Sequence, residues 1–183
     1  LLGIVPKLNL PNYGEFYEER WFTPAPAEVK TISLLGQEVP FGSRLLFCCR
    51  ELPEYKLAVE LCEDLWVASP PSIRHAVAGA TVIANCSASD ETIGKAEYRR
   101  SLVTGQSARL MAGYLYADAG RGESTTDMVF AGHDLIAENG KLLAETALFT
   151  NDLILTELDV HRLFAERRRT TTWPAAETSG YTM

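Results

Sequence analysis

One stretch of the sequence, Tyr55–Trp66, constrains the rest of the chain, and it reads Y-K-L-A-V-E-L-C-E-D-L-W. Its first half is aliphatic enough to predict a buried strand, which runs into Cys62 without a Gly or Pro. The acidic residues Glu63 and Asp64 follow directly. A thiol at the end of a buried strand is where a protein can hold a nucleophile rigidly. Free cysteine is also among the most buried residue types, so this stretch alone favours a small core side chain.

A second stretch, Leu1–Phe22, reverses that balance, and it reads L-L-G-I-V-P-K-L-N-L-P-N-Y-G-E-F-Y-E-E-R-W-F. Its apolar start predicts a strand over residues 1–5 that places Lys7 at its end, and Pro11 and Gly14 predict a loop after it. An ammonium group beside a thiol lowers the pKa of the thiol and can stabilise an oxyanion. The two strand ends therefore predict a thiol-dependent site, the alternative being that Lys7 is a solvated lysine.

These two stretches together resemble the nitrilase superfamily, and within it the glutamine-hydrolysing domains of glutamine-dependent NAD synthetases. The resemblance is carried by K-L-N-L-P-N-Y-G-E-F-Y-E, by V-E-L-C-E-D-L-W, and by the spacing of Lys7 and Cys62. A third block, N-C-S-A-S-D-E-T-I-G-K-A-E-Y-R-R at 85–100 followed by Q-S-A-R, is similar to the family's next strand, substrate loop and helix. The resemblance covers roughly residues 1–170 and implies an α/β fold, a partial nitrilase-type four-layer αββα sandwich.

The pattern of apolar residues independently predicts an α/β layered domain, because strands alternate with helices before a late run of hairpins. Further strands are expected at 31–35, 44–50, 55–61, 80–87, 114–119, 127–131, 134–137, 141–147 and 153–158, and helices within 73–79, 93–114 and 159–169. The strands at 44–50 and 55–61 are expected to form a hairpin. V-P-F-G-S at 39–43 and E-N-G-K at 138–141 are typical of turns.

Composition excludes several classes of function. With 17 Lys and Arg against 24 Asp and Glu, the net charge is −7, so neither nucleic acid nor an anionic membrane is an expected partner. No apolar run approaches the roughly 20 residues that span a bilayer, and no signal peptide is recognisable. The histidines are far apart, and we expect no metal site. Cys48, Cys49 and Cys86 are interpreted as structural, reduced thiols, and the protein is expected to be cytoplasmic.

The start and end of the sequence predict a fragment. The chain opens at Leu1 within an expected strand and without Met, so residues 1–169 are expected to form a carbon-nitrogen hydrolase domain that lacks its N-terminal part. The polar residues 170–183 predict a linker toward a synthetase domain that is absent here. No Ser-Gly-Gly-x-Asp-Ser loop occurs in the sequence. We therefore expect no cofactor in this chain, and expect ATP and Mg²⁺ in the missing domain.

The resemblance also implies a reaction. Cys62 would attack the side-chain amide of L-glutamine, release ammonia and leave a thioester for water to hydrolyse. Lys7 and the backbone N–H after Cys62 would stabilise the oxyanion, and the ammonia would serve NAD synthesis from deamido-NAD. The general base of the family is a Glu on a strand before the lysine. Residues 1–6 contain no carboxylate, so the fragment is expected to be inactive or nearly so.

Other site residues follow from the same resemblance. A second carboxylate is expected near Lys7, either Glu15 or Glu18, with Glu18 slightly favoured and a solvated charge as the alternative. Substrate contacts are implied at Tyr13, Ser89 and Lys95, although S-D-E-T at 89–92 differs from the S-P-x-H of many relatives. Trp66 is expected to form a wall of the site or to belong to the core.

Two alternatives from other functional classes remain open. The chain could be part of a free-standing amidase or carbamoylase that acts on a small amide. It could instead be a non-catalytic assembly module in which Cys62 is inert. Homo-oligomerisation through helices beside the site is expected from the resemblance alone.

Overall fold

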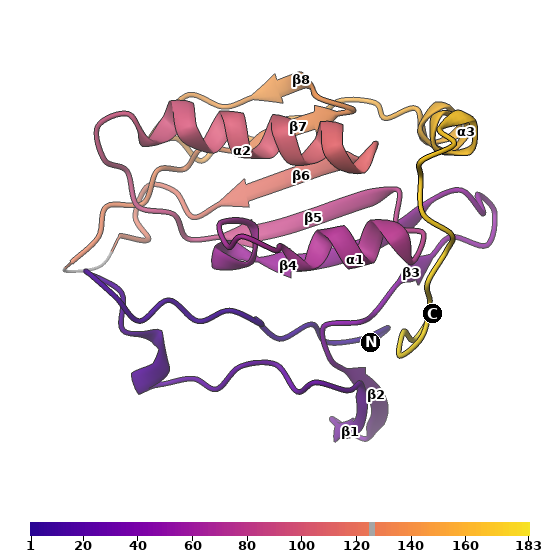
Figure 1. Cartoon of the computed structure of the whole chain (residues 1–183). Coiled ribbons are helices and arrows are strands. Elements are labelled where there is room, and N and C mark those ends of the chain that lie inside the picture. The colour runs from indigo at the N-terminus through magenta and orange to yellow at the C-terminus, as the bar shows by residue number, and fades with distance from the viewer. Residues whose placement is uncertain (125–126) are drawn as a thin grey trace.

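The computed structural model describes residues 1–124 and 127–183. In it, the chain forms a six-stranded mixed β-sheet, and two helices, α1 (Pro71–Val77) and α2 (Lys95–Leu110), lie across one face of the sheet (Figure 1). The strands lie in chain order and are β3 (Phe47–Cys48), β4 (Lys56–Leu61), β5 (Val82–Ser87), β6 (Gly113–Asp118), β7 (Leu135–Glu138) and β8 (Lys141–Glu145). The central strands β4, β5 and β6 are parallel, and the outer pairs are antiparallel. The predicted α/β fold is confirmed, and the described residues supply one helix layer and one sheet layer.

The parallel centre of the sheet follows from the two crossover helices. A parallel pair needs a long connection, and α1 and α2 provide it after β4 and β5. Register pairs Glu60 with Asn85, and Asn85 with Tyr116, so these three side chains form a row on one face of the sheet. That row shares the helix-covered face with the buried core, which includes Ile83 and Tyr114. The carboxyl ends of β4, β5 and β6 consequently meet at one edge.

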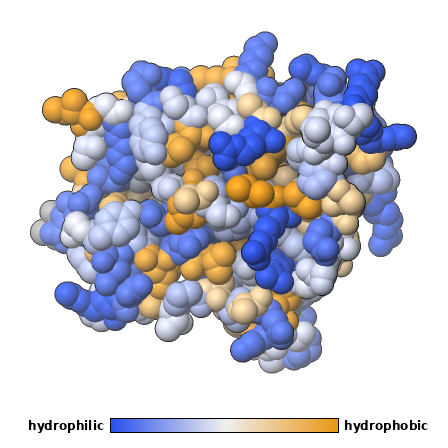
Figure 2. Space-filling view, viewed as in Figure 1, coloured by the Kyte–Doolittle hydropathy of each residue, from blue (hydrophilic) through white to orange (hydrophobic). Residues whose placement is uncertain are grey.

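The helices lie within the ranges predicted for them, apart from a slightly earlier start of α1. α2 is shorter than its predicted range because Gly94 before it and Met111 after it have left-handed backbones, with φ of 84° and 45°. The last helix, α3 (Val160–Arg169), begins after Asp159, whose carboxylate accepts a 2.9 Å hydrogen bond from the N–H of Arg162. Charged and apolar side chains are interspersed over the face of the molecule that carries α1 and α2 (Figure 2).

Two hairpins flank this architecture. β7 and β8 are joined at Asn139 and Gly140, whose φ values of 46° and 86° confirm the predicted turn. A separate hairpin is formed by β1 (Lys30–Leu34) and β2 (Gln37–Phe41), so the turn predicted at 39–43 is wrong because β2 continues to residue 41. The predicted hairpin of residues 44–50 and 55–61 is confirmed in its pairing, although β3 keeps only two residues of ladder.

Three predicted strands are wrong. Residues 1–5 and 127–131 make only isolated bridges, from Ile4 to Phe41 and from Phe130 to Asp90. Residues 153–158 form no strand in the described chain, and Leu153 and Leu155 are exposed. Apolar runs predict a strand only where a neighbouring strand offers its backbone, and in these segments no extended ladder forms.

Residues 170–183, predicted as a linker, pack against the domain in this structure. The carbonyl of Thr182 accepts a 2.9 Å hydrogen bond from the N–H of Leu46, and Tyr181 Oη lies 2.9 Å from Nδ1 of His75 on α1. Trp173 and Tyr181 also contact the hydrophobic core. The segment thus adds apolar contacts to the helix-covered side.

Candidate active site

Cys62 lies at the carboxyl end of β4, where the chain turns into the short 3₁₀ helix η2 (Cys62–Leu65). Its φ of 48° is in the left-handed region, which residues other than glycine rarely adopt. The side chain borders a small cavity of about 70 Å³. A strained turn that presents a thiol to a cavity fits the rigid placement predicted for Cys62.

The electrostatic environment of Cys62 contains opposing influences. Burial raises the pKa of the thiol above its ordinary value, the ammonium of Lys7 acts in the opposite direction, and the carboxylate of Glu18 raises the pKa further. The net direction is upward, so the protonated thiol is favoured at rest. The charge of Lys7 therefore offsets only part of the effect of burial on the thiolate, which is the form that attacks a carbonyl.

Lys7 is held by a carboxylate. Its Nζ lies 2.6 Å from both Oε1 and Oε2 of Glu18, which begins the short 3₁₀ helix η1 (Glu18–Arg20). The side chains are 15% and 28% exposed, so the pair is largely shielded from water. Glu15, the other predicted carboxylate, is exposed to solvent. Of the two, the structure brings Glu18 to Lys7.

Asp64 joins the segment that carries Lys7 to the turn that carries Cys62. Its Oδ1 accepts hydrogen bonds of 2.8 Å from both the N–H and the side-chain amide of Asn9, and its Oδ2 accepts one of 3.0 Å from the N–H of Leu61. Asp64 is only 2% exposed. Sequence reasoning missed this role, although a carboxylate just after a candidate thiol was a signal.

The cavity is lined by aromatic and charged side chains in addition to Cys62. They are Tyr13, Phe16, Glu63, Trp66, Ser89, Asp90 and Lys95, together with Ala88. Tyr13 donates a 2.7 Å hydrogen bond to Glu63, which raises the pKa of the phenol to about 12. The cavity therefore brings together all four residues for which substrate contacts were predicted, and adds Phe16, Glu63 and Asp90, which sequence reasoning missed.

Lys95 and Trp66 form one wall. The ammonium of Lys95 is paired with Asp90 and lies 5.3 Å from the ring centroid of Trp66. Trp66 makes an edge-on contact with Tyr98 at 5.4 Å and packs against the hydrophobic core. Both expectations for Trp66 hold, because the residue lines the cavity and also contacts the core.

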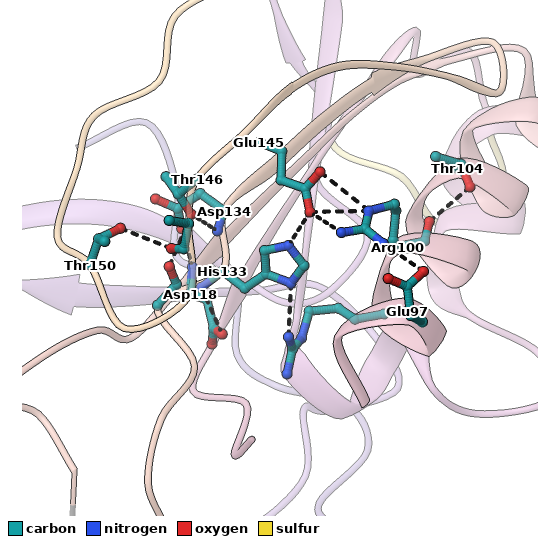
Figure 3. A network of polar contacts seen from close by, with 12 residues as sticks. Glu97, Arg100, Thr104, Asp118, His133, Asp134, Glu145, Thr146 and Thr150 are labelled. Carbon is teal, nitrogen blue, oxygen red and sulfur yellow. Dashed lines mark hydrogen bonds and ion pairs between the residues drawn. The ribbon is translucent and has the colours of Figure 1, made fainter. Parts of the chain in front are cut away.

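The side chain of Ser89 is hydrogen-bonded to Arg99, which is completely buried. The guanidinium donates to Ser89 Oγ at 3.1 Å, to the carbonyl of Asp90 at 3.2 Å and to Glu91 at 3.0 Å. It also contacts His133, and Figure 3 shows Glu145 between His133 and Arg100 on the far side. The loop that lines the cavity therefore rests on a buried ionic network.

Asn85 contacts Cys62 directly and was not predicted. Its Oδ1 accepts a 3.0 Å hydrogen bond from the N–H of Cys62, and its Nδ2 lies 3.4 Å from the carbonyl oxygen of Cys62. The signal in the sequence was one amide side chain inside the otherwise apolar run A-T-V-I-A-N-C.

The described residues also bear on metal binding, on other cavities and on membrane-spanning helices. No group of three or more His, Cys, Asp or Glu side chains in residues 1–124 and 127–183 is placed to hold a metal ion. A larger cavity, of about 420 Å³, is bordered by Ala76, Phe164 and Trp173 and does not include Cys62. In the part of the chain that the structure describes, no helix has the length and apolar character needed to cross a membrane. All four cysteines are free thiols.

Comparison with known proteins gives consistent likenesses. No protein-family model matches the chain. It is 49% identical over 171 residues to the glutamine-dependent NAD(+) synthetase of Mycobacterium tuberculosis. The aligned region covers 92% of this chain and 25% of that protein. A glutamine-dependent NAD(+) synthetase from Cytophaga hutchinsonii superposes with a TM-score of 0.70 at 32% identity, over 82% of this chain and 24% of the other. Nit3 of Saccharomyces cerevisiae, a nitrilase-superfamily member, superposes with a TM-score of 0.62 at 18% identity, over 91% and 51%.

The sheet with its helix layer has the fold of nitrilase-superfamily structures. By sequence the chain belongs with the glutamine-dependent NAD(+) synthetases and matches their amidase portion. It spans about a quarter of the length of these relatives.

Proposed function

We propose that this chain is the part of a glutamine-dependent NAD(+) synthetase that hydrolyses the side-chain amide of L-glutamine, with Cys62 as nucleophile. One observation carries the proposal. The charges of Lys7 and Glu18 both act on the pKa of the Cys62 thiol, and Cys62 borders a cavity that is lined by charged side chains of both signs. Glutamine is a zwitterion with an amide at its far end, so its recognition needs both signs near a nucleophile. A small neutral amide would need neither, which places the free-standing amidase second.

The reaction follows from these groups. The Cys62 thiolate attacks the amide carbon, and a tetrahedral oxyanion forms that Lys7 and the backbone N–H of Glu63 stabilise. The carbon–nitrogen bond breaks, the nitrogen takes up the proton that the general base removed from the Cys62 thiol and leaves as ammonia, and a thioester remains on Cys62. Water then releases glutamate and returns the thiol. Glu18 keeps the ammonium of Lys7 in place during both halves of the reaction.

The general base is proposed to come from outside residues 1–183. The family resemblance implies a Glu on a strand before Lys7 for this role, and residues 1–6 contain no carboxylate. Glu18 is engaged by Lys7 through both of its oxygens. Residues 1–183 alone are therefore proposed to hydrolyse glutamine slowly or not at all.

Substrate recognition is assigned by charge. The α-carboxylate of glutamine would bind Lys95 in competition with Asp90, with Ser89 Oγ beside it. The α-ammonium would bind Glu63, which Tyr13 orients by its 2.7 Å hydrogen bond. Trp66 and Phe16 would exclude water from the aliphatic part of the substrate.

The wider role rests on the relatives. We propose that the ammonia serves NAD(+) synthesis in a synthetase domain of the same protein, in the cytoplasm, and that the protein is a homo-oligomer. ATP and Mg²⁺ are assigned to that domain, because residues 1–183 contain no Ser-Gly-Gly-x-Asp-Ser loop for them.

The test is ammonia release from L-glutamine by the gene product that carries residues 1–183. Replacing Cys62 with Ala should abolish release, and replacing Cys86, an exposed thiol at the end of the next strand, should leave it within a few-fold of the parent. A diazo-ketone analogue of glutamine should form an adduct on Cys62 alone. Release that persists without Cys62, or an adduct elsewhere, would refute the assignment. Hydrolysis of small amides in preference to glutamine would favour the free-standing amidase.

A further inference from the structure

The amide of Asn85 contacts both backbone polar groups of Cys62. Oδ1 accepts from the N–H of Cys62 at 3.0 Å, and Nδ2 lies 3.4 Å from its carbonyl oxygen. Ser87 Oγ also donates to Oδ1, at 2.7 Å. Asn85 is 1% exposed, so water does not substitute for these contacts. The backbone that Asn85 binds is the strained one, with φ of 48°.

A second set of buried contacts determines which way this amide points. Nδ2 of Asn85 donates to Tyr114 Oη at 3.3 Å, and Tyr114 donates its own proton to Glu60 Oε1. The other oxygen of Glu60 accepts a 2.8 Å hydrogen bond from the N–H of Ser72, at the start of α1. Since ionised Glu60 only accepts, Tyr114 must point its proton at Glu60 and present its lone pairs to Asn85.

The same contacts show what would reverse the direction of the hydrogen bonds from Asn85 through Tyr114 to Glu60. A neutral side chain at position 60 that donates toward Tyr114 would turn the phenol proton toward Asn85. Asn85 would then have to present Oδ1 to Tyr114, and the N–H of Cys62 would lose its acceptor. Burial, with a smaller contribution from Asp64, raises the pKa of Glu60 to about 7, while the hydrogen bonds from Tyr114 and Ser72 favour the ionised form.

We propose that Asn85 is a positioning residue that holds Cys62 in its left-handed backbone conformation, and that Glu60, through Tyr114, fixes the orientation of the Asn85 amide. The proposal rests on the proposed function, because Cys62 is taken as the nucleophile. It gives a role to a buried carboxylate that the reaction itself does not use. None of the three residues touches the cavity.

The test is a cycle of two conservative substitutions in the gene product, Glu60→Gln and Tyr114→Phe. Glu60→Gln supplies the reversing donor, so kcat for glutamine should fall by about 10- to 100-fold with KM nearly unchanged, as expected for a misplaced nucleophile. Tyr114→Phe removes the hydroxyl group through which residue 60 acts on the orientation of the Asn85 amide. In the Tyr114→Phe background, Glu60→Gln should therefore cost no further activity, and the double variant should be more active than Glu60→Gln alone.

The control is Tyr116→Phe, because Tyr116 is a second buried tyrosine on β6 whose hydroxyl has no hydrogen-bond partner among the described residues. Tyr116→Phe should not rescue Glu60→Gln. Losses that add in the double variant, or a change confined to KM, would overturn the proposal. So would rescue by Tyr116→Phe.

A readout independent of glutamine separates this proposal from the proposed function. The rate at which iodoacetamide labels Cys62, measured by mass spectrometry, should fall in Glu60→Gln and recover in the double variant. If no variant hydrolyses glutamine but the labelling cycle holds, the positioning stands and the reaction assignment fails. Additive labelling losses overturn the positioning whatever the reaction is.

Discussion

Arg99 and His133 make a contact that is closed to solvent, with Nη1 of the arginine 2.9 Å from Nδ1 of the histidine. His133 Nε2 lies 2.6 Å from Glu145 on β8, at the edge of the sheet. Arg99 also donates to Ser89 at the cavity. One imidazole thus connects the back of the candidate site to an edge strand.

This contact predicts a large loss of stability from Arg99→Met. The substitution would leave Glu91 and His133 without their buried partner, and the free energy of unfolding should fall by about 3–5 kcal/mol. Urea unfolding measures it. Arg100→Met is the matched control on the same helix, because its side chain is 32% exposed and its ion pairs should contribute about 1 kcal/mol or less. Equal losses in both variants would contradict a special role for Arg99.

The Lys7–Glu18 pair predicts opposite shifts in the pKa of the Cys62 thiol. Burial raises that pKa, Lys7 lowers it and Glu18 raises it. Lys7→Met should therefore move the pH profile of Cys62 alkylation to higher pH, and Glu18→Gln should move it to lower pH. Glu15→Gln, at the exposed carboxylate, is the control and should leave the profile unchanged. Shifts of the same sign for Lys7→Met and Glu18→Gln would show that the pair does not act on the thiol.

The hydrogen bonds of Asp64 predict that replacing it will loosen both the segment that carries Lys7 and the turn that carries Cys62. In Asp64→Asn, an amide group would face N–H donors of Asn9 or Leu61, so unfolding should require about 1–3 kcal/mol less. Hydrogen exchange at the amide of Asn9 should rise in the same variant. Asp152→Asn, at an exposed carboxylate, should change neither quantity. Unchanged exchange at Asn9 would mean that Asp64 does not restrain the segment that carries Lys7.

His75 predicts that the protein loses stability in mild acid. Burial lowers the pKa of His75 to about 4, so between pH 6.5 and 4 the unfolded chain binds a proton that the folded chain does not. The contribution of His75 is therefore complete above about pH 6.5 and is lost as the pH falls toward 4, by about 3 kcal/mol in all.

The measurement is urea unfolding between pH 7 and 4.5. The dependence of stability on pH should be flatter in His75→Gln than in the parent, while His161→Gln, whose side chain is 68% exposed, should follow the parent. Comparing slopes removes the opposite contribution of Asp118, whose pKa burial raises to about 6. Parallel curves for His75→Gln and the parent would refute the prediction.

Local sequence patterns predicted the buried centre of the fold well. Runs such as residues 80–87 are apolar on both faces, and only a central strand satisfies such a run. Residues 1–5 and 153–158 are equally apolar, but whether they pair depends on backbone groups far away in the sequence. Turns with left-handed residues, such as Asn139 and Gly140, were predictable because few residue types adopt that geometry.

The resemblance predicted several residues that gather at the cavity, and it did not predict the residues that hold them in place. Lys7, Cys62 and the four predicted substrate contacts came from a motif, whereas Phe16, Glu63 and Asp90 of the cavity did not. Asn85, Asp64 and Arg99 act through contacts between segments distant in the sequence, which no local pattern encodes. The choice of Glu18 over Glu15 likewise needed the turn that brings η1 back to Lys7.

The hydrogen bonds from Asn9 to Asp64 also bear on the order of folding. Their partners are 55 positions apart, so the chain must close a long loop before the segments that carry Lys7 and Cys62 come together. Local elements such as the β7–β8 hairpin need no such closure. A newly made chain would therefore acquire much of its secondary structure before these two segments come together, and the candidate site would be completed late in folding.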